Sequence, residues 1–118
     1  MHEMAIAESL FSLVIDEMNK HNCTHLISVE VTYGAMAGIM PEALQLSFEL
    51  IANESNYKNV KLNFVCIPIK LKCSSCGFEF EVKESDYGMI TPCSICGEQL
   101  GHILLQGNEL FLSNLEAE

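Results

Sequence analysis

The chain has 118 residues and is 49% hydrophobic, which is enough for one modest core and a small additional lobe. Six lysines, no arginine and sixteen acidic residues give a formal net charge of -10. Such a charge repels phosphate backbones, so nucleic-acid binding is not expected.

The amino terminus lacks the basic and then apolar regions of a signal peptide. No apolar run approaches the roughly 18 residues that a membrane span needs. We therefore expect a cytoplasmic protein that does not associate with membranes.

The first segment predicts an amphipathic helix over about residues 4–21, because its apolar residues recur at helical spacing. Its apolar row consists of Ile6, Leu10, Leu13, Val14 and Met18. Its solvated face consists of Glu8, Ser12, Asp16 and Lys20. Asn22 stands where a helix stop is expected.

Residues 26–34 alternate between apolar and polar and predict a half-buried strand. The small-residue loop 34–38 follows it. Pro41 then opens a second helix, because proline is tolerated in the first turn. The buried row predicted for this helix is Leu44, Phe48 and Ile51. The polar run 53–56 ends it.

A long strand is predicted from Lys58, but its alternation reverses near Pro68. One slipped residue exchanges the two faces of a strand, and proline cannot donate to a ladder. We therefore predict a bulge or bend there, at the boundary of a second lobe. Short strands are expected at 78–82 and 102–106, and a strand at 109–115 returns to the main sheet.

Two Cys-x-x-Cys-Gly sequences define this second lobe, the first with Cys73 and Cys76 and the second with Cys93 and Cys96. Two intervening residues make a tight turn that aims both thiolates at one ion, and the glycine lets the backbone fold beneath the sulfurs. Four thiolates complete a closed tetrahedral shell, which indicates a structural zinc site. A single iron could use the same ligands, and two disulfides are a further alternative.

The predicted fold is therefore α+β, with a small mixed sheet, two helices and an inserted four-cysteine zinc-ribbon lobe. Residues 1–70 and 106–118 are expected to form an α/β domain that binds nickel, and residues 71–105 a zinc-ribbon domain. The nickel hypothesis comes from the amino terminus.

His2 occupies the second position of the chain. A free amine, backbone amides and an imidazole there can chelate one metal in fused rings. Ni(II) and Cu(II) prefer square-planar coordination by such nitrogen ligands. The backbone nitrogens of His2 and Glu3 lie where a helix begins, so binding metal through them sacrifices no helix bond. A terminal histidine that is merely solvated is the alternative.

Three features together resemble the HypA/HybF family of hydrogenase maturation proteins. They are Met1-His2-Glu3 before an amphipathic helix, the two cysteine pairs, and the sequence Gln106-Gly107-Asn108-Glu109-Leu110. The resemblance covers essentially the whole chain.

The resemblance implies a nickel metallochaperone, not an enzyme, that helps to insert nickel into [NiFe] hydrogenase. It implies that His2 binds nickel and that the four cysteines bind zinc. The implied partners are a GTPase nickel-insertion accessory protein, the hydrogenase large-subunit precursor and, for some members, urease maturation proteins. A zinc-ribbon interaction module or a rubredoxin-like electron carrier, both without a labile nickel site, is the alternative function.

Three other residues have less defined roles in the sequence. Cys23 and Cys66 are expected to be ordinary reduced thiols. His102 is expected to be a surface histidine at a strand start, with contact to a transferred ion as its alternative role.

Overall fold

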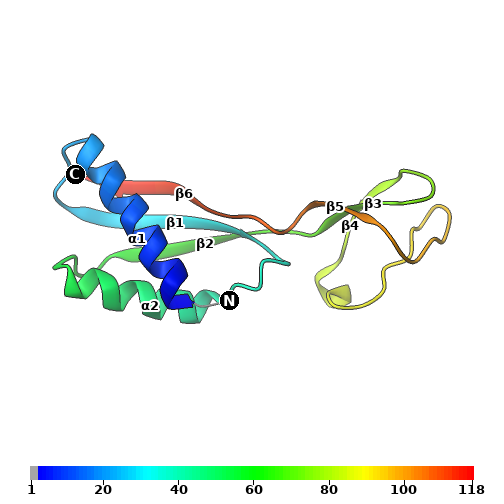
Figure 1. Ribbon diagram of the computed structural model, residues 1–118, viewed down its shortest axis with the longest axis horizontal. Coiled ribbons are helices and arrows are strands. Elements are labelled where there is room, and N and C mark those ends of the chain that lie inside the picture. Colours follow the sequence, from blue (N-terminus) through cyan, green and yellow to red (C-terminus); the bar gives the residue numbers. More distant parts are fainter. Residues whose placement is uncertain (1–2) are drawn as a thin grey trace.

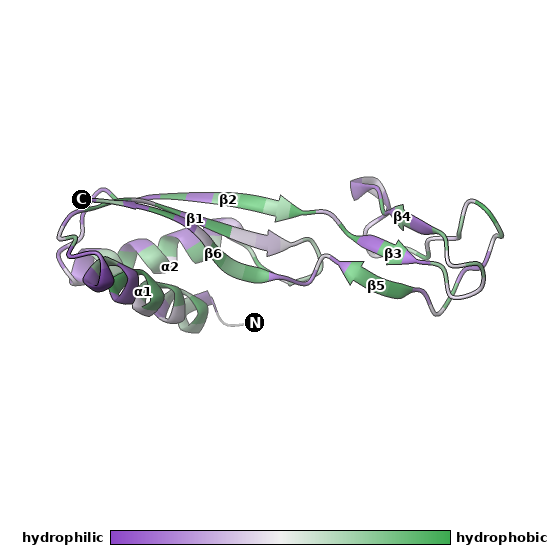
Figure 2. Ribbon diagram, turned by 90° about the horizontal axis from the view of Figure 1, so that it is seen from above, coloured by the Kyte–Doolittle hydropathy of each residue, from purple (hydrophilic) through white to green (hydrophobic). Residues whose placement is uncertain are grey.

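Two small sheets lie end to end in the computed structural model, which describes residues 3–118 (Figure 1). The molecule is elongated, with extents of 55 × 25 × 18 Å. Both helices lie on one face of the first sheet, and the second sheet forms a separate lobe with its loops (Figure 2). The predicted α+β class, with a mixed sheet, two helices and an inserted four-cysteine lobe, is confirmed.

The first sheet has the strand order β2-β1-β6. Its strands are β1 (Leu26–Gly34), β2 (Lys61–Ile67) and β6 (Leu110–Ala117). The helices that cover it are α1 (Glu3–Lys20) and α2 (Pro41–Glu54). Strand β1 pairs with β2 in parallel and with β6 antiparallel, so the sheet is mixed and β1 is its central strand.

The second sheet is antiparallel and has the order β4-β3-β5. Its short strands are β3 (Lys70–Lys72), β4 (Glu79–Glu81) and β5 (Ile103–Gln106). Pro68 and Ile69 connect β2 to β3, so the reversed alternation marks a passage from one sheet to the next. All three strands lie between β2 and β6 in the sequence, which makes the lobe an insertion.

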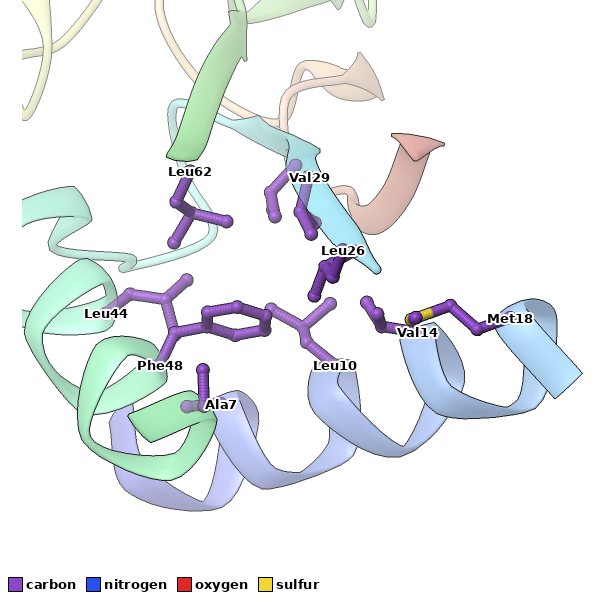
Figure 3. Close-up of a cluster of buried hydrophobic side chains, with 11 residues drawn as sticks. Ala7, Leu10, Val14, Met18, Leu26, Val29, Leu44, Phe48 and Leu62 are labelled. Atoms are coloured by element: carbon purple, nitrogen blue, oxygen red, sulfur yellow. The ribbon is translucent and has the colours of Figure 1, made fainter. Parts of the chain in front are cut away.

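The hydrophobic core lies between the first sheet and its two helices (Figure 3). Phe48 of α2 is its largest fully buried side chain, and Ala7 of α1 lies against it in the same cluster. The Phe11 ring meets the Phe48 ring edge to face, with 5.9 Å between ring centroids. Because the Ala7 side chain is small, α1 and α2 can pack closely at this position of the core.

Two residues of the predicted apolar rows, Leu13 and Ile51, are less buried than the prediction required. Leu13 is 50% exposed, while Ala7 is fully buried in its place. Similarly, Ile51 is only partly buried, while Ala52 is 1% exposed. Because α1 and α2 pack against each other as well as against the sheet, the buried face of each helix includes an alanine.

The backbones of Gly34 and Gly107 pass very close to each other where the two lobes join. A Cβ atom on Gly34 would lie 2.0 Å from the carbonyl carbon of Gly107, so only glycine fits there. The Gly34 amide donates to the Glu109 carbonyl at 2.7 Å, and the Gln106 side chain donates to the Pro68 carbonyl at 3.1 Å. The sequence 106–110 that carries part of the family resemblance is therefore the connection between the lobes.

Helices capable of crossing a bilayer are not found in the part of the chain that the structure describes. The longer helix, α1, has 18 residues and carries charged side chains on its exposed face.

Candidate metal centre

The two Cys-x-x-Cys turns have the same backbone geometry. In the first turn the Gly77 amide donates to the Cys73 carbonyl at 3.1 Å, and in the second the Gly97 amide donates to the Cys93 carbonyl at 2.9 Å. Both glycines have a positive φ, 78° and 81°, a conformation that side-chain-bearing residues rarely adopt. Each turn thus places its two sulfurs on the same side.

The four cysteine sulfurs converge to within 4.8 Å of one another. The Sγ atoms of Cys73 and Cys96 are 3.4 Å apart, and those of Cys76 and Cys93 are 3.6 Å apart. Zn–S bonds of ~2.3 Å in a tetrahedron place the sulfurs about 3.8 Å apart, so the cluster has the size of a zinc site. All six cysteines of the chain are free thiols, so the two-disulfide alternative is not what the structure contains.

Backbone amides favour the thiolate form of two of these sulfurs. The amides of Cys76 and Ser75 point at the Cys73 sulfur and lower the pKa of that thiol to about 6. The amides of Cys96 and Ile95 lower the pKa of Cys93 in the same way. Because a metal binds the thiolate, these amides prepare the site for a cation.

Side chains outside the cluster fasten the first turn to the rest of the lobe. The Ser74 hydroxyl donates to the Leu100 carbonyl at 2.9 Å, and the Ser75 hydroxyl donates to the Glu98 carboxylate at 3.1 Å. These bonds cross from the first cysteine turn to the segment that follows the second. They hold the two turns in the register that the metal requires.

His102 also belongs to this framework, at the position just before β5. Its Nδ1 accepts from the Ser74 amide at 3.4 Å, so the neutral ring carries its proton on Nε2 and donates to the Thr91 carbonyl at 3.1 Å. The edge of its ring meets the Phe80 ring. With both nitrogens engaged, His102 ties three segments of the lobe together, a role that no local sequence signal indicated.

The other cysteines lie away from the cluster. Cys23 is half-buried in the connection between α1 and β1, and Cys66 is exposed near the end of β2. Neither belongs to the four-sulfur group.

His2, the predicted nickel ligand, lies outside the described residues. Glu3 begins α1 and is an acidic residue in its first turn, where a carboxylate suits the helix dipole. The first turn of α1 belongs to the first lobe, at the end of α1 that is nearer to the second lobe, which carries the cysteine cluster (Figure 1).

A four-sulfur ribbon inserted into a small helix-covered sheet defines a metal-binding protein with two distinct lobes. The family model described as "Hydrogenase/urease nickel incorporation, metallochaperone, hypA" matches residues 1–117. The chain therefore belongs to the HypA family of metallochaperones, and the resemblance seen in the sequence is confirmed.

Relatives with known names support the family assignment over the full length of the chain. The chain is 38% identical to the hydrogenase maturation factor HypA of Solidesulfovibrio magneticus, with 100% of both chains covered. It is 30% identical to the protein of that name from Aquifex aeolicus, covering 100% of this chain and 98% of that one.

Solved structures agree as well. The solution structure of the Ni metallochaperone HypA from Helicobacter pylori is 29% identical, with a TM-score of 0.67 and coverage of 99% of this chain and 97% of that one. A second solution structure of a HypA protein is 28% identical, with a TM-score of 0.71 and coverage of 100% and 97%. The likeness extends over both lobes.

Proposed function

We propose that this protein carries nickel at its amino terminus for insertion into [NiFe] hydrogenase and holds zinc in its ribbon. The observation that carries the proposal is the family match, which spans residues 1–117 and so includes both the amino terminus and the ribbon. Nickel is the cargo, and zinc is a resident structural ion.

Cys73, Cys76, Cys93 and Cys96 are the proposed zinc ligands. Four thiolates leave no open coordination position, so the ion is suited to structure and not to catalysis or transfer. Among residues 70–106, three hydrophobic residues are buried, and two of them are the ligands Cys73 and Cys93. The lobe therefore has almost no apolar core of its own, and metal binding supplies its folding energy.

The proposed nickel ligands are the His2 imidazole and the backbone nitrogens of His2 and Glu3. Supporting this, α1 begins at Glu3, and amides in the first turn of a helix have no intrahelical partner. Deprotonating an amide there breaks no helix hydrogen bond. The square-planar preference of Ni(II) fits a chain of fused rings through consecutive backbone nitrogens.

The proposed domains are 1–70 with 106–118 for nickel and 71–105 for zinc. The separation has a functional reason: a labile ion and a permanent ion with different ligands exchange less when their sites are apart. Nitrogen ligands at the terminus suit nickel, and the closed thiolate shell keeps the zinc ion bound while nickel is transferred.

One added residue at the amino terminus is expected to weaken nickel binding sharply. The extension places the terminal amine in a peptide bond and moves the chelate rings, while the imidazole stays in the chain. Calorimetric titration of the zinc-loaded protein with Ni(II), with and without the extension, measures the effect. Equal affinity and an equal d–d absorption spectrum in both proteins would exclude the backbone ligands.

Delivery through other proteins is the second part of the proposal. The partners are a GTPase nickel-insertion accessory protein and the hydrogenase large-subunit precursor, with urease maturation proteins as a further class, all in the cytoplasm. The sequence contains no phosphate-binding loop, so the isolated protein is not itself expected to act as an enzyme. Appreciable GTP hydrolysis by the purified protein, free of any partner, would contradict this.

A further inference from the structure

An open sheet edge runs along β6. This strand pairs with β1 on one side, and within residues 3–118 no strand pairs with its other side. The outward backbone groups of its 8 residues are therefore a template for another strand. Figure 1 shows β6 as the outermost strand of the first sheet on this side.

An apolar groove accompanies this edge. A cavity of about 640 Å³ lies between α1 and the first half of β6, and its lining includes Leu13, Leu110 and Phe111. A second hollow of about 250 Å³ continues it along the second half of β6, and the two share Glu17 and Leu112. The space beside the strand is thus open over most of its length.

Large apolar side chains are exposed on both sides of this edge: Leu13 lies in the groove, and Phe111 alternates with Leu110 and Leu112, which pack against the core. Leu13 on α1 is 50% exposed and Phe111 on β6 is 47% exposed. A strand added beside β6 would point every second side chain toward the groove between the strand and α1. It would cover apolar surface and satisfy backbone groups at the same time, whereas a helix in the groove would leave the edge unpaired.

The charged side chains of β6 and its ends are negative, whereas Glu17 on α1 is paired with Lys20 at 3.3 Å. Residues 84–118 contain six acidic residues and no lysine or arginine. Glu17 lines the groove, and Glu109 and Glu116 lie at the two ends of β6. The opposite edge of the sheet differs, because β2 starts with Lys61, and an edge lysine discourages strand pairing.

We propose that the β6 edge is a docking site for an extended segment of a partner protein, with alternating apolar side chains and lysine or arginine at its ends. The segment adds as a fourth strand next to β6, and its basic ends meet Glu109 and Glu116. A second copy of this chain is disfavoured as the occupant, because each copy carries a net charge of -10.

A capped nine-residue peptide, with valine alternating with threonine between terminal lysines, is the probe for this site. Added to the zinc-loaded full-length protein, it is expected to slow hydrogen exchange at alternate amides of β6 and to leave β2 unchanged. A peptide of the same sequence with alternate backbone amides methylated, and one with glutamates at its ends, are each expected to bind at least ten-fold more weakly. The interaction with the lysine peptide should also weaken in salt.

Two leucines of similar exposure provide matched variants. Leu13→Asp places a charge in the groove and should weaken peptide binding at least ten-fold. Leu46→Asp, at a residue of α2 that is 61% exposed and does not line the groove, should change it less than two-fold. Thermal unfolding of both variants checks that they are folded; should Leu13→Asp be unstable, Leu13→Ser takes its place in the comparison, with Leu46→Ser as its control.

Three results would overturn the proposal. They are the absence of β6 protection at millimolar peptide, equal binding of the methylated peptide, and an equal effect of the two leucine substitutions. Protection of β6 amides in concentrated protein without peptide, together with a doubled mass in solution, would assign the edge to a second copy instead. Nickel is absent from all of these samples, so the outcome is independent of the amino-terminal site.

Discussion

Cys93→Ala is expected to unfold about residues 71–105 while α1, α2 and the first sheet stay folded. Cys93 is 3% exposed and contributes both a sulfur of the cluster and one of the few buried side chains of the lobe. Structural zinc contributes on the order of 10 kcal/mol to small zinc-binding domains, which exceeds what three short strands retain without a core. The remaining three sulfurs cannot close a tetrahedral shell.

Residue-resolved hydrogen exchange and zinc content measure this result. In the variant, amides of β3, β4 and β5 should exchange as in an unfolded chain, while those of β1 stay protected and zinc falls well below one ion per chain. Cys66→Ala is the matched control, since Cys66 is exposed on β2 and outside the cluster. It should retain zinc and full protection. A lobe that stays protected after zinc removal would show that the metal has no structural role.

Acidification should release zinc for the same reason. Each ligand must be a thiolate, so protons compete with the metal as the pH falls. The backbone amides that lower the pKa values of Cys73 and Cys93 resist this competition, so zinc should be held at neutral pH and released progressively on acidification.

His2→Ala is expected to abolish nickel binding and leave the zinc content and the fold unchanged. The substitution removes the imidazole and with it one ring of the proposed chelate. Among the described residues, the cluster of fully buried side chains starts at Ala7 on α1, so we expect the core to persist in this variant. Calorimetric titration with Ni(II) and the absorption spectrum of the nickel complex measure the effect, and zinc analysis and circular dichroism supply the controls.

The nickel site should also depend on pH in a defined direction. Binding requires a neutral imidazole and deprotonated backbone nitrogens, so it releases protons and weakens as the pH falls below about 6.5, the ordinary pKa of histidine. Loss of nickel by His2→Ala therefore mimics acidification. Nickel bound by the variant with unchanged affinity and geometry would remove His2 from the site and direct attention to the free cysteines.

Histidines elsewhere in the chain give a matched comparison for that variant. His25 lies between α1 and β1, with no assigned role at the metal sites. His25→Ala should bind nickel as the unsubstituted protein does. A comparable loss in both variants would mean that general histidine content, not the amino-terminal chelate, holds the ion.

Local signals in the sequence determined most of the elements. The bounds of β1 agree with the alternation over 26–34, and α2 begins at Pro41 as the sequence predicts. Asn22 has a φ of 54° just after α1, a conformation that ends a helix and that asparagine tolerates. These features depend on residues that are neighbours in the chain, so periodicity and turn chemistry are sufficient to find them.

The cysteine cluster was also predictable, although its two halves are far apart in the sequence. Each Cys-x-x-Cys-Gly turn is a local structure that presents two thiolates, and two such turns together supply the four ligands of a closed tetrahedral site. The structure brings all four sulfurs together as expected. For His2, the prediction comes from the chain terminus and the family resemblance, and its test remains the nickel titration.

Tertiary structure alone decided which apolar residues are buried and how the lobes are joined. Leu13 and Ala7 both suit the apolar face of α1, but the approach of α2 covers Ala7 and leaves Leu13 in the open groove. Likewise, Gly34 must be glycine because Gly107 crosses it, and His102 is fixed by Ser74 and Thr91. Burial and hydrogen bonding at these positions depend on partners distant in the chain, which periodicity and spacing do not encode.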